Sequence, residues 1–116
     1  MVGVTDIPDW CWVEGLGKGT YEFSAFNVPS PEQLTAMRER SPIAHIGAVK
    51  TPTIICLGEK DRRVPPSQGI EYYHLLKSRG VPTKLLIFPE DDHAIDHPAS
   101  EAEQWFNVAQ WIQRHI

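Results

Sequence analysis

The sequence predicts an α/β fold in which parallel strands are flanked by helices, and three observations indicate that class. Residues 53–57 and 84–88 form two short, mostly apolar runs that end at Gly58 and Pro89, a pattern typical of buried parallel strands. The segment between them has room for a helix of about fourteen residues, which suits the crossover that parallel strands require. Because two strands form a thin sheet for a chain of 116 residues, we expect an incomplete part of a larger domain.

The amino-terminal residues 1–26 show no sustained helical or strand periodicity, although aromatic residues and glycines are frequent among them. Structureless stretches of this length are uncommon in compact domains unless they are functional or cover a site. We therefore expect a long loop whose aromatic side chains need a cover from elsewhere.

A first helix is expected from residue 31 to about residue 39. Ser30 is a suitable N-cap, Pro31 fits the first helical position, and Gln33 can complete a capping box with Ser30. The Ser-Pro pair at 41–42 then ends this helix, because the residue before a proline disfavours the helical conformation.

A second helix should connect the two strands. It is expected to begin at Pro65 or Pro66 and to end near Gly80, with basic residues in its last turn. Its buried face is predicted from apolar and aromatic residues at helical spacing, namely Ile70, Tyr72, Tyr73 and Leu76.

A closing amphipathic helix is expected after the second strand. Ser100 and Glu103 have the spacing of a capping box, which places the start of the helix at that point. One stripe of this helix is predicted to face the core and consists of Trp105, Ala109, Ile112 and Ile116.

Composition and charge exclude several function classes. The net charge of −4 comes from interspersed acidic and basic residues, so we expect no nucleic-acid partner and no attraction to an anionic membrane surface. The sequence has two cysteines, Cys11 and Cys56, which are too few for a disulfide framework. We therefore expect reduced thiols and a cytoplasmic protein. The sequence also contains no apolar run of about 20 residues and no signal-peptide pattern at its start.

Asp61 and His93 are the candidate catalytic residues. Asp61 lies in a polar turn after the first strand, and His93 follows the end of the second strand by five residues. Taken singly, a turn aspartate commonly caps backbone amides, and a loop histidine commonly has no special role. As a pair they are more informative, because a catalytic imidazole needs a carboxylate to fix its tautomer. Their order along the chain is the order of acid and histidine in α/β-hydrolases.

The competing chemistry is metal binding. Five possible ligands fall within seven residues, namely Asp91, Asp92, His93, Asp96 and His97. Prolines bracket the stretch and the glutamate of an HExxH pattern is missing, so we expect no metal site and no cofactor, and acidic side chains that are solvated. The remaining histidines are expected on the surface or in packing roles, namely His45, His74 and His115.

A nucleophile is missing from the sequence. No serine stands in a G-x-S-x-G setting, and no serine or cysteine follows a strand and opens a helix as a nucleophile elbow must. Without a nucleophile and an oxyanion hole, covalent acyl transfer is impossible, so the chain alone is expected to be catalytically inactive.

Residues 57–65, with the sequence LGEKDRRVP, resemble the aspartate-bearing segment of serine peptidases of the prolyl oligopeptidase family. The loop that contains His93 is similar to the last catalytic loop of that family. Residues 1–11 and 41–46 further resemble the members that release N-acylated amino acids from blocked peptides. The resemblance implies a cytosolic enzyme with an amino-terminal β-propeller and a carboxy-terminal α/β-hydrolase domain. Residues 1–116 would be the C-terminal portion of that catalytic domain.

By motif position, the resemblance gives Asp61 the acid role and His93 the general-base role, with the serine upstream of Met1. An N-acylated peptide would be the substrate in the full-length context only. Ala94 departs from the family, which usually has glycine after this histidine, so a loop that needs a positive φ there would be altered. The alternative hypothesis is a non-enzymatic module that associates with itself or a partner through an exposed sheet edge.

Overall fold

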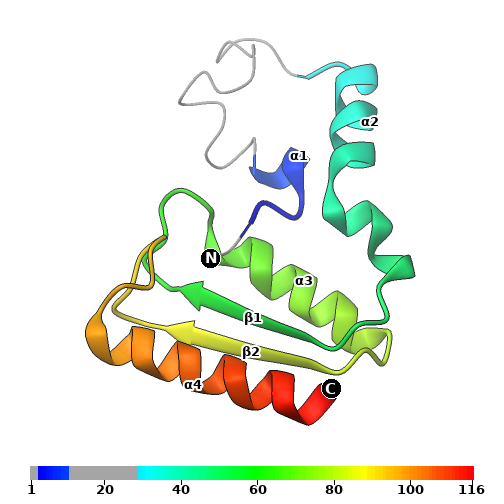
Figure 1. Cartoon of the computed structure of the whole chain (residues 1–116). Coiled ribbons are helices and arrows are strands. Elements are labelled where there is room, and N and C mark those ends of the chain that lie inside the picture. Colours follow the sequence, from blue (N-terminus) through cyan, green and yellow to red (C-terminus); the bar gives the residue numbers. More distant parts are fainter. Residues whose placement is uncertain (1–2, 11–28) are drawn as a thin grey trace.

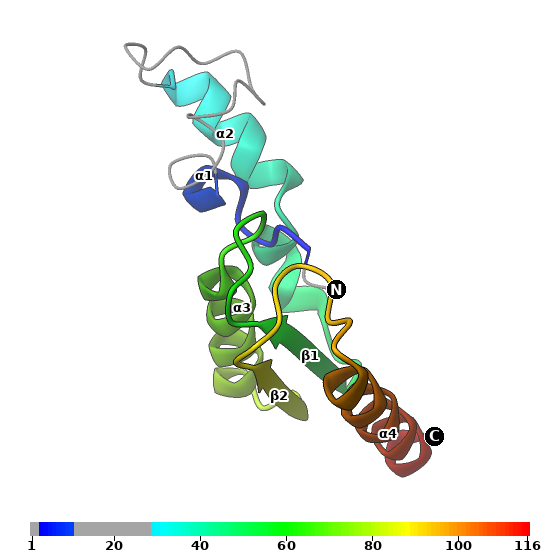
Figure 2. The same cartoon turned by 90° about the vertical axis from the view of Figure 1, so that its left-hand side faces the viewer.

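The computed structural model describes residues 3–10 and 29–116. Within this part, β1 (Thr53–Gly58) and β2 (Thr83–Phe88) form a parallel sheet, in register from Thr53 opposite Thr83 to Gly58 opposite Phe88. Helix α3 (Pro66–Ser78) connects the strands, and α4 (Pro98–His115) follows β2. Figures 1 and 2 show α3 and α4 on opposite faces of the sheet. The predicted α/β class is confirmed, and each strand is one residue longer than predicted.

Helix α3 begins and ends where the sequence predicts. Pro66 occupies the first helical position, where its missing N–H removes no intrahelical hydrogen bond. At the other end, Gly80 has a φ of 75°, and its N–H donates to the carbonyl of Lys77 at 3.0 Å. The N–H of Val81 donates to the carbonyl of Leu76 at 3.1 Å. Glycine suits this left-handed position because it has no Cβ to clash.

The core lies between α3 and the sheet. Leu57 and Leu76 are fully buried there. An added Cβ on Gly69 would overlap the Leu57 side chain, so the absence of a side chain lets the helix approach β1 closely. Leu76 therefore confirms part of the predicted buried face, whereas buried Gln68 was missed because a polar residue gives no apolar signal.

Buried Gln68 anchors the amino-terminal residues on α3. Its Oε1 accepts hydrogen bonds from the backbone N–H groups of Thr5 and Asp6 at 2.9 and 2.8 Å. Helix α1 (Ile7–Trp10) follows, and the N–H of Ile7 donates to Ser41 Oγ at 3.0 Å. The first part of the expected loop is thus held in place and ends in a short helix. Residues 1–2 and 11–26 of that loop lie outside the described residues.

The first predicted helix and its capping box are confirmed. Helix α2 (Pro31–Arg40) has Ser30 as its N-cap. Ser30 Oγ accepts from the N–H of Gln33 at 3.2 Å, and Gln33 Oε1 accepts from the N–H of Ser30 at 2.8 Å. A 3₁₀ helix, η2 (Pro42–Ala48), then leads toward β1.

The predicted start of the closing helix is wrong. Helix α4 begins at Pro98 with His97 as its N-cap, and the His97 side chain makes no capping hydrogen bond. Proline has its φ preset for the first helical position, so Pro98 starts the helix and Ser100 lies inside its first turn. The expected capping box of Ser100 and Glu103 does not form. No helix in the described part of the chain is long and apolar enough to cross a membrane.

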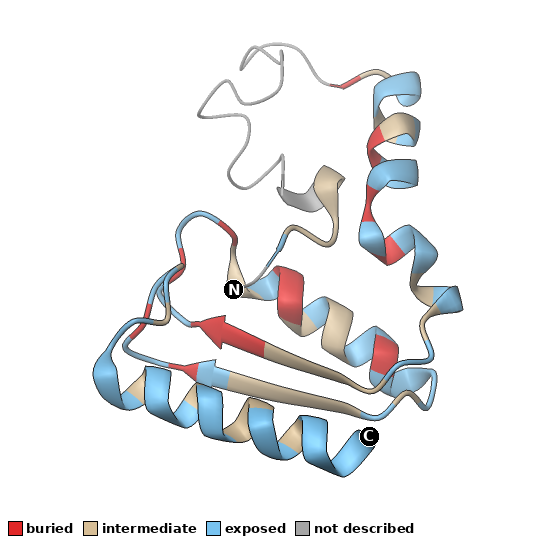
Figure 3. Cartoon of the chain, in the orientation of Figure 1, coloured by how far each residue is buried: buried red, intermediate tan, exposed pale blue. Residues whose placement is uncertain are grey.

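The predicted buried stripe of α4 is also wrong. Trp105 is 67% exposed and Ile112 is 50% exposed, and Figure 3 shows most of the helix as exposed. The half-buried side instead contains Gln104, Asn107, Val108 and Trp111. Lys84 Nζ on β2 donates to Asn107 Oδ1 at 2.7 Å, so a polar contact is part of the side that faces the sheet. A sheet of two strands covers that side alone and leaves the apolar stripe uncovered.

The strands are less buried than the sequence predicts. In β2, Phe88 is buried, Ile87 is 45% exposed and the other residues are half-buried. The reason is the same small sheet, since a strand at an edge has a neighbour on one side only. Exposed apolar strands and helix faces promote association.

We therefore predict that the isolated chain self-associates at micromolar concentration. Trp105→Ser should lower the average mass measured by light scattering, because it removes a large exposed apolar side chain from α4. Gln110→Ser is the control, since Gln110 is exposed and lies on neither stripe. A sharp two-state unfolding of a monomer at this concentration would contradict the prediction.

Candidate active site

Two loops at the carboxyl ends of the strands are joined through their backbones. The N–H of Glu59 donates to the carbonyl of Phe88 at 3.0 Å, and the N–H of Lys60 donates to the carbonyl of Asp91 at 2.9 Å. At Gly58, an added Cβ would overlap the carbonyl oxygen of Asp92 and lie 2.7 Å from that of Asp91. Glycine is required here because the backbone of the second loop occupies the space of a side chain.

Asp61 is held rigidly in the first loop. The residue is 7% exposed, and its Oδ1 accepts hydrogen bonds from the N–H groups of Arg63 and Val64 at 2.8 and 2.9 Å. This is the turn-capping arrangement that is common for aspartate. It uses one carboxylate oxygen and leaves the other for a second partner.

That second partner is His93. Its Nδ1 lies 2.9 Å from Asp61 Oδ2, so the structure brings the two predicted site residues together. Because a carboxylate oxygen accepts, the contact suits the tautomer in which Nδ1 carries the proton. The side chain of His93 is 29% exposed. Among the described residues the ring makes no other hydrogen bond, so Nε2 is unengaged.

A pocket of about 560 Å³ opens beside His93. It lies between the two loops and is lined by Lys60, Arg62, Arg63, Glu90, Asp92, His93 and Ala94. Lys60 Nζ and Glu90 Oε2 form an ion pair at 2.9 Å across its rim, with both side chains mostly exposed. An ion pair so exposed contributes little stability. The pocket gives solvent-borne groups a path to the imidazole.

Ala94 fits its position without strain. No non-glycine residue in the described part of the chain has a positive φ, so the loop does not need the conformation that glycine would allow. The N–H of Ala94 donates to Asp92 Oδ1 at 3.2 Å, which stabilises the turn around His93.

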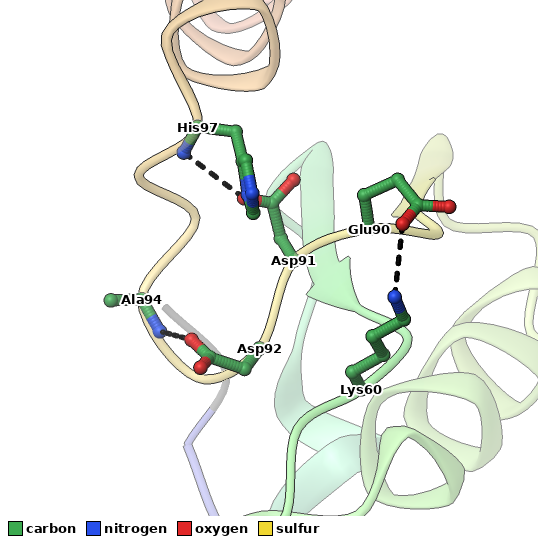
Figure 4. A network of polar contacts seen from close by, with 6 residues as sticks. All are labelled: Lys60, Glu90, Asp91, Asp92, Ala94 and His97. Carbon is green, nitrogen blue, oxygen red and sulfur yellow. Dashed lines mark hydrogen bonds and ion pairs between the residues drawn. The ribbon is translucent and has the colours of Figure 1, made fainter.

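Asp91 and His97 form a second carboxylate–imidazole pair, which Figure 4 shows. Asp91 Oδ1 accepts from the backbone N–H of His97 at 3.1 Å and contacts His97 Nδ1 at 2.7 Å. Asp91 is fully buried, so the expectation that the acidic loop residues are solvated is wrong for it. The first N–H groups of a helix need acceptors, and Asp91 lies beside the start of α4. Asp92 and Asp96 are exposed, as expected.

The pKa values of this second pair are shifted in opposite directions. Burial alone would raise the pKa of Asp91, but the Ser100 side chain and His97 lower it below its ordinary value. The hydrogen bond and the charge of Asp91 raise the pKa of His97, and Asp96 and Glu90 add to that rise. The protonated imidazole and the ionised carboxylate therefore stabilise each other.

We predict that the pair of Asp91 and His97 stabilises the fold most between pH 3.8 and pH 6.5, the ordinary pKa values of the two side chains. The contribution of His97 is present below 6.5 and is lost as the pH rises through its raised pKa. The contribution of Asp91 is present above 3.8 and is lost as the pH falls through its lowered pKa. His97→Gln should thus destabilise the chain more at about pH 5.5 than at about pH 9, in urea unfolding at one chain concentration. In an Asp91→Asn background this pH dependence should shrink to the smaller part that Asp96 and Glu90 contribute, and an undiminished pH dependence would contradict the assignment.

One group of side chains has the proximity that a metal ion requires. Asp91, Asp96 and His97 each offer a ligand atom, and these atoms lie within 4.8 Å of one another. Asp92 and His93, which belong to the ligand set considered from the sequence, are outside this group. His97 Nδ1 is engaged by Asp91, so a metal ion would have to bind through Nε2 or displace that hydrogen bond.

The other histidines make local contacts. His45 Nε2 lies 2.8 Å from the carbonyl oxygen of Glu39, and His115 Nδ1 lies 2.9 Å from that of Trp111. His74 contacts the ring of Tyr73 edge-on at 5.2 Å between centroids. Cys56 is a free, buried thiol; burial raises its pKa, although a hydrogen bond with Gln104 opposes the rise. None of these groups lines the pocket beside His93.

Known proteins resemble the chain in sequence and in fold. The sequence model of the prolyl oligopeptidase family matches residues 2–116. The acylamino-acid-releasing enzyme of Arabidopsis thaliana is 46% identical over 99% of this chain and 15% of its own length. That of Homo sapiens is 42% identical over 100% of this chain and 15% of its own length. The solved structure of Pyrococcus horikoshii acylaminoacyl peptidase matches 74% of this chain and 15% of that chain, with a TM-score of 0.68 and 24% identity. The chain thus spans about 15% of the length of the curated relatives it matches.

Proposed function

The chain belongs to the prolyl oligopeptidase family, and from that premise we propose that residues 1–116 are the C-terminal portion of the catalytic domain of a serine peptidase. The proposed reaction is the release of acylated amino acids, which the names of its relatives state, and the proposed substrates are N-acylated peptides. In this proposal Asp61 orients His93, and His93 is the general base for a serine outside the 116 residues. No cofactor takes part.

The observation that carries the proposal is the contact between His93 Nδ1 and buried Asp61 Oδ2 at 2.9 Å. A carboxylate at Nδ1 selects the tautomer whose Nε2 can accept a proton, and it stabilises the imidazolium that then forms. Since His93 lines the pocket, its Nε2 can meet a serine hydroxyl delivered from another segment. Deprotonation of that hydroxyl would start attack on the acyl carbonyl.

The experiment that tests the proposal is a chimera in which this chain replaces the matching segment of the Arabidopsis thaliana relative. We expect the chimera to hydrolyse an N-acetylated peptide and to be labelled by a serine-directed phosphonate outside the 116 residues. The isolated chain should show neither reaction, because none of its serines stands in a nucleophile elbow.

The relative without this segment is the control and should be inactive. A well-folded chimera that fails to hydrolyse the peptide would contradict the proposal. Stoichiometric phosphonate labelling of a serine in the isolated chain would contradict the assignment of the nucleophile to another segment.

A cytoplasmic location is part of the proposal. It rests on the two cysteines of the chain. Two cysteines are too few for the disulfide framework that is typical of small exported proteins. Accumulation of a tagged chain in the secretory pathway would contradict it.

A second candidate function is that of a non-enzymatic interaction module, and the exposed stripe of α4 favours it. Trp105, Ile112 and Ile116 are 67%, 50% and 97% exposed, and such apolar surfaces mark association sites. Under this hypothesis Asp61 and His93 take no part in chemistry. An active chimera that loses turnover with His93→Ala would exclude this hypothesis.

A further inference from the structure

The loop that carries His93 is closed at its base. It leaves the sheet after Phe88 and returns to α4 at His97, and Asp91 bridges its two ends with hydrogen bonds from Oδ1 to the backbone N–H and the ring of His97. Residues 92–96 lie between these two positions and contain His93. Where the ends of a short loop are joined, fewer conformations remain for the residues between them.

Asp91 also ties this base to the loop of Asp61. The carbonyl of Asp91 accepts a hydrogen bond from the N–H of Lys60 at 2.9 Å. Lys60 lies two residues after Gly58 in the first loop. The N–H of Asp91 donates to the carbonyl of Phe88 at 3.3 Å. One residue therefore contacts the end of β2, the first loop and the start of α4, and these three segments flank the positions of Asp61 and His93.

The burial of Asp91 makes this link specific. The side chain is fully buried, and an ionised group there is costly unless hydrogen bonds and charge compensate for the lost water. His97 supplies both to Oδ1, through its N–H and its imidazole. Asp92 and Asp96 belong to the same loop and are exposed, so they carry a similar charge without this burial.

We propose that Asp91 is a positioning residue for His93: by closing the loop through His97, it holds the imidazole at Asp61. The inference rests on the proposed function, because the position of His93 matters for catalysis only if His93 is the general base. Asp91 itself touches no reacting atom in this proposal. Its effect is on the population of chains in which His93 Nδ1 reaches Asp61.

The first test is magnetic resonance of the whole chain with isotope-labelled histidine, which reports the tautomer of each imidazole. In the wild-type chain, His93 should carry its proton on Nδ1 and show the downfield signal of a proton shared with a carboxylate. Asp91→Ala should shift His93 toward the tautomer mixture of a free imidazole. Asp96→Asn is the matched control, since it removes a similar charge from the same loop, and it should leave the His93 signals unchanged.

A second variant keeps the test informative if Asp91→Ala disturbs folding. His97→Ala removes the ring partner of Asp91, and the side chain of His97 is 59% exposed, so little packing is lost. It should weaken the His93 signature while the backbone signals of β1 and α3 stay in place. Asp91→Asn should retain part of the signature, because its amide oxygen can still accept the N–H of His97.

In the chimera, Asp91→Ala should lower kcat on the order of 10- to 100-fold with little change in KM, the size expected for a misplaced catalytic group. Asp96→Asn should change kcat by less than about twofold, or about 0.4 kcal/mol of barrier.

Unchanged His93 signals in folded Asp91→Ala and His97→Ala chains would overturn the inference and leave the proposed function intact. A wild-type chain without a proton on Nδ1 would overturn the contact of His93 with Asp61, and the proposed function with it.

Discussion

Asp61→Asn should lower kcat of the chimera by about 10⁴-fold, the loss known for the same change in a Ser-His-Asp triad. In this chain both carboxylate oxygens are engaged: Oδ1 accepts the N–H groups of Arg63 and Val64, and Oδ2 contacts His93. The substitution preserves the shape of the side chain and its turn. The measurement is kcat for an N-acetylated peptide, beside circular dichroism to confirm the fold.

In Asp61→Asn, the backbone N–H groups that donate to Oδ1 determine how the new side-chain amide is oriented. The amide oxygen is needed by the N–H groups of Arg63 and Val64, so the amide nitrogen takes the place of Oδ2. That nitrogen is a donor, and Nδ1 of His93 must then be an acceptor with its proton on Nε2. A protonated Nε2 cannot accept the proton of a serine, and the neutral amide does not stabilise an imidazolium. The turn survives while the general base is lost.

His93→Ala should reduce turnover at least as much as Asp61→Asn. The double variant should add little, because members of such a unit act together. Asp96→Asn is the control, since its carboxylate is exposed in the same loop, and it should change kcat by less than about twofold, or about 0.4 kcal/mol of barrier. Asp91 is unsuitable as a control because it is fully buried. Near-normal turnover for Asp61→Asn would show that another carboxylate has the acid role.

The elements that sequence predicts correctly are those with local signals. The strands end at glycine or proline, α2 has its capping box at Ser30, and α3 ends at Gly80. Each signal acts within a few residues, so the rest of the fold cannot override it easily. Asp61 and His93 could be paired from the sequence because parallel strands deliver their following loops to one edge of the sheet.

The features that sequence analysis missed depend on tertiary contacts. The sheet-facing side of α4 includes Asn107, which accepts a hydrogen bond from Lys84, and periodicity alone does not favour this side over the apolar stripe. Asp91 is one of several acidic residues in its loop, and it is buried because α4 begins beside it. The one available signal for that start was Pro98, since proline is frequent at the first helical position.

Gly58 is the residue at which a single added methyl group should have the largest structural effect. Its Cβ would overlap the carbonyl of Asp92 and lie 2.7 Å from that of Asp91. Both obstacles are backbone atoms of the loop that carries His93. They cannot turn away as a side chain does, and the hydrogen bond from Lys60 N–H to the Asp91 carbonyl holds them in place.

Gly58→Ala should therefore destabilise the isolated chain by about 3 kcal/mol or more in urea unfolding at one chain concentration, the upper part of the range for overpacking. In the chimera it should lower kcat on the order of 100-fold, because the shifted loop moves His93 away from Asp61.

Two other glycines provide graded controls for this substitution. Gly47→Ala meets nothing closer than the guanidinium of Arg79 at 3.8 Å, so its effect should stay within about 0.5 kcal/mol. Gly69→Ala meets the flexible end of the Leu57 side chain, which can adjust, and should cost about 1–3 kcal/mol. Hydrogen exchange would locate the damage: in Gly58→Ala the amide of Lys60 should lose protection, because its hydrogen bond crosses to the carbonyl of Asp91 in the displaced loop. Wild-type stability and protection in Gly58→Ala would mean that the two loops separate freely, and that their backbone contacts do not set the position of His93.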